Sequence, residues 1–451
     1  MKILHISKTI ITNNGEPIIN GGLLVEDSRI ISVGQTEDFG DLSNYKLIDH
    51  KDSLICPGFI NLHTHLLYSK VGQINGSDGL FPWLEHLISN TKDWQEDDYR
   101  SSINYGINQA LSSGTTFLVE NTPSNLSAQE LSKSSIRALI GIEVFGSDEE
   151  KAPEIFETAL EQISKCHSRL DRESSQTTDS VQSMDSHFRG NDRTEFTFSP
   201  HAPYDVSKPL WQRLLQWSKE NNKPLLTHLE ESPDEKNWWQ NKSGKAINFW
   251  KSINKLEPKL KYWKKYDSGI DFLNTNDLLS KNVIGTHLCQ ASKKDLTLLK
   301  EKNINLVHCP RSNYFLNNGT TNLKFWNELG LTWGLGTDSI AGNKNLDLLQ
   351  ELKFAINQQN ITYGFNIPAK EAFKAITLNA AKVISKDKEL GYLKKGYYAD
   401  FLVYDIKGKS ACTYQAPYDL IVFNIENNKD LKEVWINGGK AWIRDQILNK
   451  I

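Results

Sequence analysis

The sequence has few of the residues that build disulfide frameworks. Its 451 residues include five cysteines, an odd number that is spread widely and contains no CxxC pair. This usage excludes a disulfide framework and a cysteine-based zinc ribbon. It also favours a reducing compartment, and we therefore expect a cytoplasmic protein.

Long apolar runs and an excess of one charge are also missing. No run approaches the roughly 18 to 20 apolar residues that cross a bilayer, so we expect no membrane span. Met1 to Thr12 lacks the pattern of a signal peptide and predicts a first strand. The formal net charge of -3 gives no electrostatic reason to bind nucleic acid or an anionic membrane. We therefore expect a small-molecule partner, and a homodimer stays open.

The apolar content that is present suffices for a large core. A hydrophobic fraction of 38% with 24% charged residues is typical of a globular protein with one large and one smaller domain. Short β-type runs with turn signals fill residues 1–55 and return within residues 396–451. We expect these two ends to form one small antiparallel β-sheet domain, a β-sandwich.

Residues 56–395, between these ends, alternate apolar β-type runs with helical patterns. Eight buried strands separated mostly by helices indicate an α/β fold, a (β/α)8 TIM-like barrel. The predicted strands are Leu54–Leu62, Thr115–Val119, Ala138–Val144, Phe196–Ser199, Leu225–Thr227, Val283–Thr286, Asn305–Val307 and Leu331–Leu335.

Two segments interrupt this alternation. Residues 168–194 are rich in Ser, Asp, Arg and Thr, which predicts a solvated, flexible insertion, and we discount His187 with it. Residues 232–282 carry four tryptophans and many lysines. Such a segment can form a lid over the barrel mouth, or its tryptophans can pack between helices; we favour packing.

Polar residues gather where the predicted barrel strands end. His63 and His65 are spaced i, i+2, so in a strand both imidazoles lie on one face and can bind one metal ion. A solvated pair of histidines is the alternative for this motif alone. The further polar residues at predicted strand ends are His201, His228, His287 and Asp338. Since the C-terminal ends of barrel strands share one mouth, metal binding is favoured.

We assign His63, His65, His228 and Asp338 as ligands of one divalent metal ion, since three imidazoles and a carboxylate suit zinc. Iron and manganese are alternatives. Such an ion lowers the pKa of water towards about 7, and Asp338 can accept the water proton.

Two further residues complete the predicted acid–base chemistry. Glu231 follows His228 by three residues and could shuttle protons to a substrate ring nitrogen, with Glu230 as its rival. His287 could hydrogen-bond the attacking oxygen. We interpret Cys289, Cys309 and His308 as packing residues.

With these residues in hand, the chain resembles the amidohydrolase superfamily over nearly its whole length. The motifs PGFINLHTH, THLEES, GTHL and GTDS occur in the family's order. The resemblance implies a metal-dependent hydrolase, and TFSPHAPY, which has no lysine where two-metal members carry one, implies a mononuclear site. The pieces FSPHAPY, HLEES and HCPRSN are similar to the branch of nucleoside deaminases and triazine hydrolases. That branch implies that His201 contacts substrate, that Glu231 shuttles protons, that His287 assists at the reacting carbon and that Trp83 lies near the substrate.

The expected function is hydrolytic deamination of a purine-type nucleoside with release of ammonia. HCPRSNYFL resembles aminofutalosine deaminases most, and S-adenosylhomocysteine and methylthioadenosine are related candidate substrates. Guanine deamination or triazine hydrolysis is the first alternative, and a non-catalytic scaffold is the second. The cytidine-deaminase class of zinc enzyme is excluded, because no PCxxC pair is present.

Overall fold

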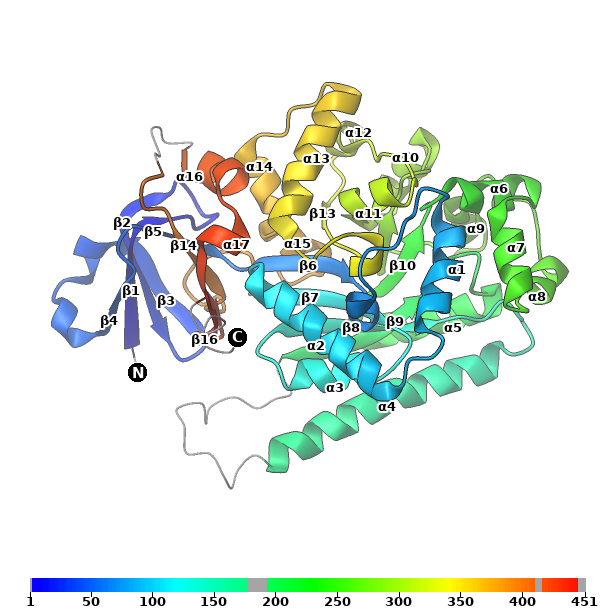
Figure 1. Cartoon of the computed structure of the whole chain (residues 1–451), viewed down its shortest axis with the longest axis horizontal. Coiled ribbons are helices and arrows are strands. Elements are labelled where there is room, and N and C mark those ends of the chain that lie inside the picture. The colour runs from blue at the N-terminus through cyan, green and yellow to red at the C-terminus, as the bar shows by residue number, and fades with distance from the viewer. Residues whose placement is uncertain (1, 177–192, 410–415, 445–451) are drawn as a thin grey trace.

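The chain builds two separate eight-stranded sheets. The computed structural model describes residues 2–176, 193–409 and 416–444. One sheet lies beside both chain ends, and the other lies among the helices in the larger part of the molecule (Figure 1). The prediction of a (β/α)8 barrel with a separate small β-domain from both termini is confirmed.

The terminal sheet has the order β16-β15-β14-β5-β1-β2-β3, with β4 added beside β1. It is mixed rather than antiparallel, because β1 pairs in parallel with both β4 and β5. Two short 3-10 helices, Thr36–Phe39 and Leu42–Asn44, lie between β3 and β4. The chain thus returns to β1 by a crossover, which allows parallel pairing. The strands are β1 Lys2–Ile10, β2 Ile18–Glu26, β3 Arg29–Gln35, β4 Lys46–Asp49, β5 Ser53–Pro57, β14 Phe401–Asp405, β15 Leu431–Ile436 and β16 Gly439–Ile443.

The predicted strand Leu54–Leu62 is wrong as a single element, because it divides at Gly58 between the two sheets. β5 ends at Pro57 in the terminal sheet, and the next strand begins at Phe59 in the barrel. A side chain at Gly58 would overlap that of Thr116, and the Gly58 N–H donates to the Asp400 carbonyl at 3.0 Å. A residue without a side chain is needed where the two sheets meet.

The barrel strands follow one another in sequence order, and all neighbours are parallel. Between the last strand and the first, the N–H groups of Thr337 and Asp338 donate to the His63 carbonyl at 3.1 and 2.9 Å. These bonds bring the end of the last strand to the end of the first. The strands are β6 Phe59–Thr64, β7 Thr115–Thr122, β8 Arg137–Val144, β9 Thr194–Pro200, β10 Leu225–Leu229, β11 Val283–His287, β12 Asn305–His308 and β13 Trp333–Leu335.

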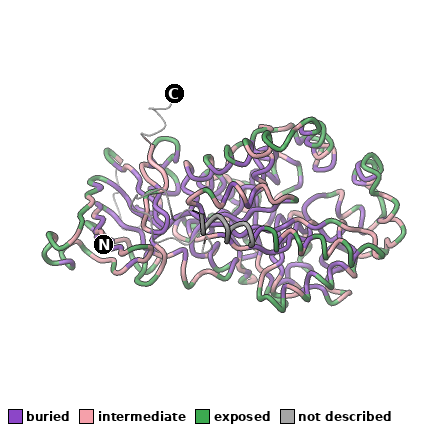
Figure 2. Tube along the Cα trace, turned by 90° about the horizontal axis from the view of Figure 1, so that it is seen from below, coloured by how far each residue is buried: buried purple, intermediate pink, exposed green. Residues whose placement is uncertain are grey.

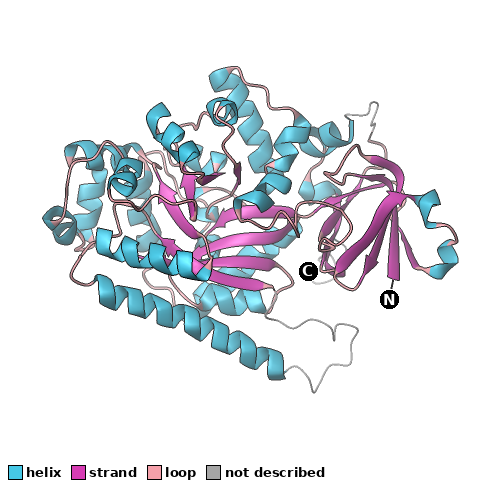
Figure 3. Cartoon of the chain, turned by 180° about the vertical axis from the view of Figure 1, so that it is seen from behind, coloured by secondary structure: helices cyan, strands magenta, loops and turns pink. Residues whose placement is uncertain are grey.

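Helices cover the outside of the barrel strands (Figure 3). Buried residues follow the strands, and exposed residues follow the outer helices and loops (Figure 2). Among the described residues, no helix has the length and apolar character to cross a membrane. The helices are α1 Leu80–Thr91, α2 Glu96–Ser112, α3 Leu126–Ser132, α4 Ala152–Gln176, α5 Lys208–Asn221, α6 Pro233–Asn241, α7 Lys245–Ser252, α8 Leu256–Lys261, α9 Gly269–Thr275, α10 Lys293–Glu301, α11 Pro310–Phe315, α12 Leu323–Glu328, α13 Leu348–Tyr363, α14 Ala369–Lys374, α15 Leu378–Val383, α16 Ala416–Asp419 and α17 Asn427–Asp430.

The insertion predicted as a loop at residues 168–194 begins as helix. α4 continues to Gln176, and β9 begins at Thr194. The amphipathic start of α4 buries Ala159 and Ile163, and extending a formed helix needs far less free energy than nucleating one. Residues 177–192, including His187, lie outside the described residues.

The tryptophan-rich segment forms four helices, α6 to α9, rather than an open loop. Trp238 and Trp250 pack edge to face at 4.7 Å between ring centroids, and Trp239 stacks on Phe272 at 5.2 Å. All three tryptophans are buried. The packing interpretation is confirmed for them, although Trp250 also lines a cavity at the barrel mouth.

Candidate metal centre

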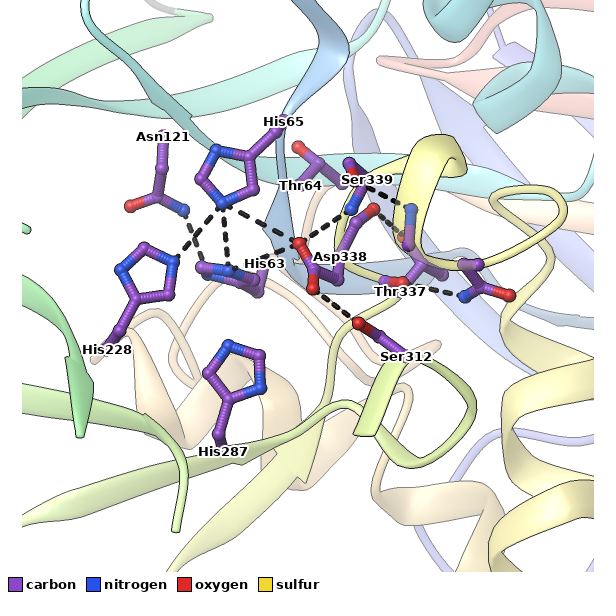
Figure 4. A network of polar contacts seen from close by, with 12 residues as sticks. His63, Thr64, His65, Asn121, His228, His287, Ser312, Thr337, Asp338 and Ser339 are labelled. Carbon is purple, nitrogen blue, oxygen red and sulfur yellow. Dashed lines mark hydrogen bonds and ion pairs between the residues drawn. The ribbon is translucent and has the colours of Figure 1, made fainter. Parts of the chain in front are cut away.

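Three histidines direct one ring nitrogen each at a common point (Figure 4). The Nε2 atom of His65 lies 3.2 Å from that of His63 and 3.3 Å from that of His228. Nitrogens bound to one tetrahedral zinc ion at about 2.0 to 2.1 Å would be about 3.3 to 3.4 Å apart. The spacing therefore matches a shared metal ion, although the histidines come from β6, the residue after it, and β10.

Asp338 joins this group from the loop after β13. Its Oδ1 atom lies 3.8 Å from His63 Nε2 and 3.7 Å from His65 Nε2. The carboxylate is held by the Ser339 N–H at 2.7 Å and the Ser312 hydroxyl at 2.6 Å. Asp338 has φ of 61°, a left-handed backbone that costs free energy for a residue other than glycine and is common at functional sites.

Gly336 explains how β13 comes so close to β6. A Cβ atom at Gly336 would lie 2.6 Å from the Cβ atom of His63, so no other residue fits without moving this histidine. The Gly336-Thr337-Asp338 sequence thus brings the end of β13 close to His63 and places the Asp338 carboxylate on a strained backbone.

Hydrogen bonds fix the ring nitrogens that face the centre. The Nδ1–H of His228 donates to the His201 carbonyl at 2.8 Å, which leaves Nε2 with a free lone pair. His63 Nδ1 lies 3.0 Å from the Asn121 amide, which also bonds Ser199 at 3.0 Å. A histidine that binds metal through Nε2 keeps its proton on Nδ1, so the amide oxygen would face His63 in that state.

His65 is held by its chain neighbours. Glu120 accepts from the Thr64 hydroxyl at 2.8 Å and from the Leu66 N–H at 3.0 Å, on either side of His65. Burial raises the pKa of Glu120 to about 8. These bonds fix the turn that carries His65 beyond the end of β6.

The chemistry of the group fits a cation. Burial, together with the neighbouring histidines, lowers the pKa of His63 and of His228 well below the usual value, so both rings are neutral near pH 7. The Nε2 atoms of these two rings lie 3.2 and 3.3 Å from that of His65, too close for every one of them to carry a proton. A divalent cation at the centre would satisfy the lone pairs of these nitrogens.

His287 lies beside the group without joining its closest contacts. Its Nδ1–H donates to Asn313 Oδ1 at 2.8 Å, and its buried Nε2 has no hydrogen-bond partner in the part of the chain that the structure describes. That atom lies 3.8 Å from Glu231 Oε1. With φ of 80°, His287 is another strained residue at the site, and its unused nitrogen is available to a bound molecule.

Glu231 and its rival Glu230 point to different places. Glu231 lines the cavity and accepts from the Asn318 amide at 3.0 Å. Glu230 instead accepts from the Gly269 N–H of α9 at 2.6 Å. Burial raises the pKa of Glu231, and it raises that of Glu230 to about 8. The geometry favours Glu231 for contact with a substrate.

A cavity of about 640 Å³ opens from the predicted ligands towards solvent. Its walls include His65, His228 and Asp338 at one end and apolar side chains from several elements further out. The apolar lining residues include Leu84, Leu87, Ile88, Phe145, Ile155, Ile253 and Pro258. The site is therefore part of a largely apolar pocket.

Besides Glu231, the other two residues predicted to bind substrate, Trp83 and His201, also line this cavity. The indole N–H of Trp83 donates to the Ala341 carbonyl at 3.2 Å, so only its ring is free for a ligand. His201 lies over His228, with ring centroids 4.8 Å apart, and its Nδ1 lies 2.6 Å from Asp205 Oδ2. Burial opposes protonation of His201, but Asp205 outweighs it and raises the pKa.

The residues interpreted as packing lie outside the cavity lining. Cys309 and His308 are buried, and Cys289 is half-buried beside Thr321. Burial raises the pKa of both thiols, which disfavours thiolate ligation.

Sequence reasoning missed the residues that support the site. Asn121 and Glu120 follow the predicted strand Thr115–Val119, so polar residues at a strand end were an available signal. Asp205 and Lys259 contact each other across more than 50 residues of chain, and Lys259 lies where the helical pattern is irregular. No local pattern indicated that pair.

A barrel with converging histidines at its mouth is suited to a metal-dependent hydrolase, and comparison with known proteins identifies the class. The model of the amidohydrolase family matches residues 54–440. The chain therefore belongs to the amidohydrolase family, and the prediction of a hydrolase acting on C–N bonds is confirmed.

Curated and solved relatives match over nearly the whole chain. A 5-methylthioadenosine/S-adenosylhomocysteine deaminase of Bacillus cereus (strain 03BB102) is 27% identical, covering 98% of this chain and 94% of the relative. The solved aminofutalosine deaminase of Helicobacter pylori, in complex with methylthio-coformycin, is similar with a TM-score of 0.77, 22% identity and coverage of 97% and 100%. A zinc-bound adenosine deaminase of Xanthomonas campestris has a TM-score of 0.76, 18% identity and coverage of 98% and 93%.

Proposed function

We propose that the chain is a metal-dependent deaminase of purine-type nucleosides that carry a substituent on the sugar. The observation that carries the proposal is the cavity of about 640 Å³ that opens from the histidine group towards solvent. Its volume falls in the range of about 300 to 1,000 Å³ usual for small-molecule sites. A purine base occupies only its inner end, so the apolar outer walls leave room for a sugar and its 5′ group.

The metal ligands in this proposal are His63, His65, His228 and Asp338, with zinc first and iron or manganese as alternatives. When bound, such an ion supplies Lewis acidity that makes water a competent nucleophile near neutral pH. The 3.2 to 3.8 Å spacings among the four side chains support the assignment.

The remaining steps belong to the protein's own side chains. Asp338 accepts the proton of the attacking water, and His287 Nε2, which has no other partner, hydrogen-bonds the attacking oxygen. Glu231, whose pKa is raised by burial, protonates a ring nitrogen, then takes up the hydroxyl proton of the adduct and passes it to the departing amine. The carbon–nitrogen bond to the exocyclic amine breaks, ammonia leaves and a carbonyl remains.

Substrate contacts would come from the outer cavity. His201 and the ring of Trp83 both line this cavity, although the two residues are more than 100 positions apart in the sequence. Both side chains can contact a base or a sugar. The names of the curated relatives support methylthioadenosine and S-adenosylhomocysteine as first candidates. The structural neighbour named for aminofutalosine supports that nucleoside as the third.

The test is ammonia release by protein purified without chelator and assayed for metal. We expect near one divalent metal ion per chain and turnover of at least one of the three nucleosides. Guanine and a chlorotriazine are the comparison substrates, and turnover confined to them would replace the proposed substrate class. Protein that binds no metal and releases no ammonia from any of them would contradict the proposal.

A further inference from the structure

A buried lysine of the tryptophan-rich segment is connected to His201 through one carboxylate. The ammonium of Lys259, in α8, donates a hydrogen bond to Asp205 Oδ1. The other carboxylate oxygen of Asp205 lies 2.6 Å from His201 Nδ1. The side chain of Lys259 is 3% exposed. Lys259, Asp205 and His201 thus form a continuous series of polar contacts from α8 to the wall of the cavity.

The Lys259 ammonium has all three of its donors occupied. It also donates to the Tyr204 carbonyl at 2.8 Å and to the Ser147 hydroxyl at 3.0 Å, and it lies 4.5 Å from the centre of the Trp250 ring. An ammonium makes three hydrogen bonds, so none is left for a ligand. Lys259 also lines the cavity, but with its donors occupied its ammonium acts on a ligand through the groups that it bonds, and of these Asp205 is the one that contacts His201.

Asp205 is fixed in turn and orients His201. With Lys259 on one carboxylate oxygen, the other accepts from the Nδ1–H of His201, which leaves the ring's Nε2 for contacts in the cavity. The same ring packs against Phe145, with centroids 4.5 Å apart. A buried carboxylate between two donors has little freedom to turn, because either rotation would break a charged hydrogen bond.

We propose that Lys259 and Asp205 are positioning residues that hold the His201 ring in its substrate-contacting orientation and so couple the packing of α8 to substrate binding. This rests on the proposed function, in which His201 contacts the nucleoside. The helices after β10 thus contribute to substrate affinity through a buried ion pair, without contacting the reacting atoms.

The kinetic test compares Lys259→Met with Lys261→Met on the same helix. Lys261 is 56% exposed and pairs with Glu150 at 2.7 Å, so it matches the charge change without touching Asp205. We expect Lys259→Met to raise KM about tenfold with kcat changed less than about threefold and metal content unchanged. Lys261→Met should leave KM within about twofold.

A double-substitution cycle separates positioning from general damage. In a His201→Ala background, Lys259→Met should change KM by less than about twofold, because the residue through which it acts is gone. Independent, multiplicative losses would overturn the proposal, and so would an unchanged KM in Lys259→Met alone. If Lys259→Met does not fold, Asp205→Asn takes its place in the same cycle with the same expectation.

A structural readout tests the proposal without turnover. In crystal structures of the two lysine variants, the His201 ring should leave its position against Asp205 in Lys259→Met and keep it in Lys261→Met. A ring that stays in place in Lys259→Met would overturn the positioning role whatever the substrate is. Failure of the wild-type protein to release ammonia from any nucleoside would instead count against the proposed function.

Discussion

Two groups of histidines in this molecule differ in what their nitrogens face. At the barrel mouth, the Nε2 atoms of His63 and His228 lie 3.2 and 3.3 Å from that of His65, beside a cavity. In the terminal sheet, His5 Nδ1 lies 3.0 Å from His50 Nε2, so one proton bonds the two rings to each other.

The surroundings of the two groups differ in the same way. His5 packs edge to face on Phe401 at 4.9 Å and on Trp435 at 4.6 Å, and neither His5 nor His50 lines the cavity at the barrel mouth. Burial and a lowered pKa are common to His63 and His228 at the mouth and to His5 and His50 in the sheet, and therefore do not mark a metal site. Convergent lone pairs next to an open cavity distinguish the mouth.

The largest expected effect comes from exchanging one histidine in each group. His63→Asn should lose the bound metal and reduce kcat/KM by about a thousandfold or more, because a ligand is removed. His50→Asn should keep the metal and leave kcat/KM nearly unchanged. Metal analysis and ammonia assays on both variants check this, and metal retained at full occupancy by His63→Asn would end the ligand assignment.

The next effect separates the two adjacent glutamates. Glu231→Gln should lower kcat by about 100- to 10,000-fold while the metal stays bound, since a proton donor is lost. Glu230→Gln is the matched control. Burial raises the pKa of Glu230 to about 8, so near pH 7 it is largely protonated and an amide mimics it. A greater loss of kcat in the Glu230 variant would reverse the assignment.

A smaller effect tests the support of His63. Asn121→Ala should weaken metal affinity by about 10- to 100-fold, because His63 loses the partner that fixes its ring. Asn305→Ala is the control, since Asn305 begins β12 and bonds the Val383 carbonyl at 3.0 Å. Competition with a chelator measures both affinities, and equal values would remove the orienting role of Asn121.

The smallest effect is on stability and concerns the sheet histidines. Burial lowers the pKa of His5 to about 3 and that of His50 to about 4, below the value of 6.5 for the unfolded chain. Above pH 6.5 both states are neutral and stability does not change. As pH falls below 6.5 the unfolded chain takes up protons that the folded one refuses. The free energy of unfolding should then fall by at most about 1.4 kcal/mol per pH unit for each histidine.

Urea unfolding at pH 7, 6 and 5, with metal in excess, measures this slope. The double variant His5→Leu and His50→Leu should show a shallower dependence on pH than the wild type. The same slope in both proteins would mean that the pair does not titrate on unfolding.

The local sequence pattern predicted most of the site residues, although these residues meet only through contacts between distant parts of the chain. The nitrogens and the carboxylate of the proposed metal site lie at the ends of apolar strands, so His63, His228 and Asp338 could be found one strand at a time. The strand at Leu54–Leu62 was wrong because both halves are apolar and buried, and only the meeting of two sheets at Gly58 divides them.

The sequence by itself determined the barrel, the terminal sheet and the histidines at the mouth, because hydrophobic period and residue chemistry are local properties. Tertiary structure alone decided which nitrogens converge, which glutamate faces the cavity and that Lys259 is connected to His201 through Asp205. Those facts depend on side chains brought together from distant parts of the chain, and spacing along the chain carries no record of such contacts.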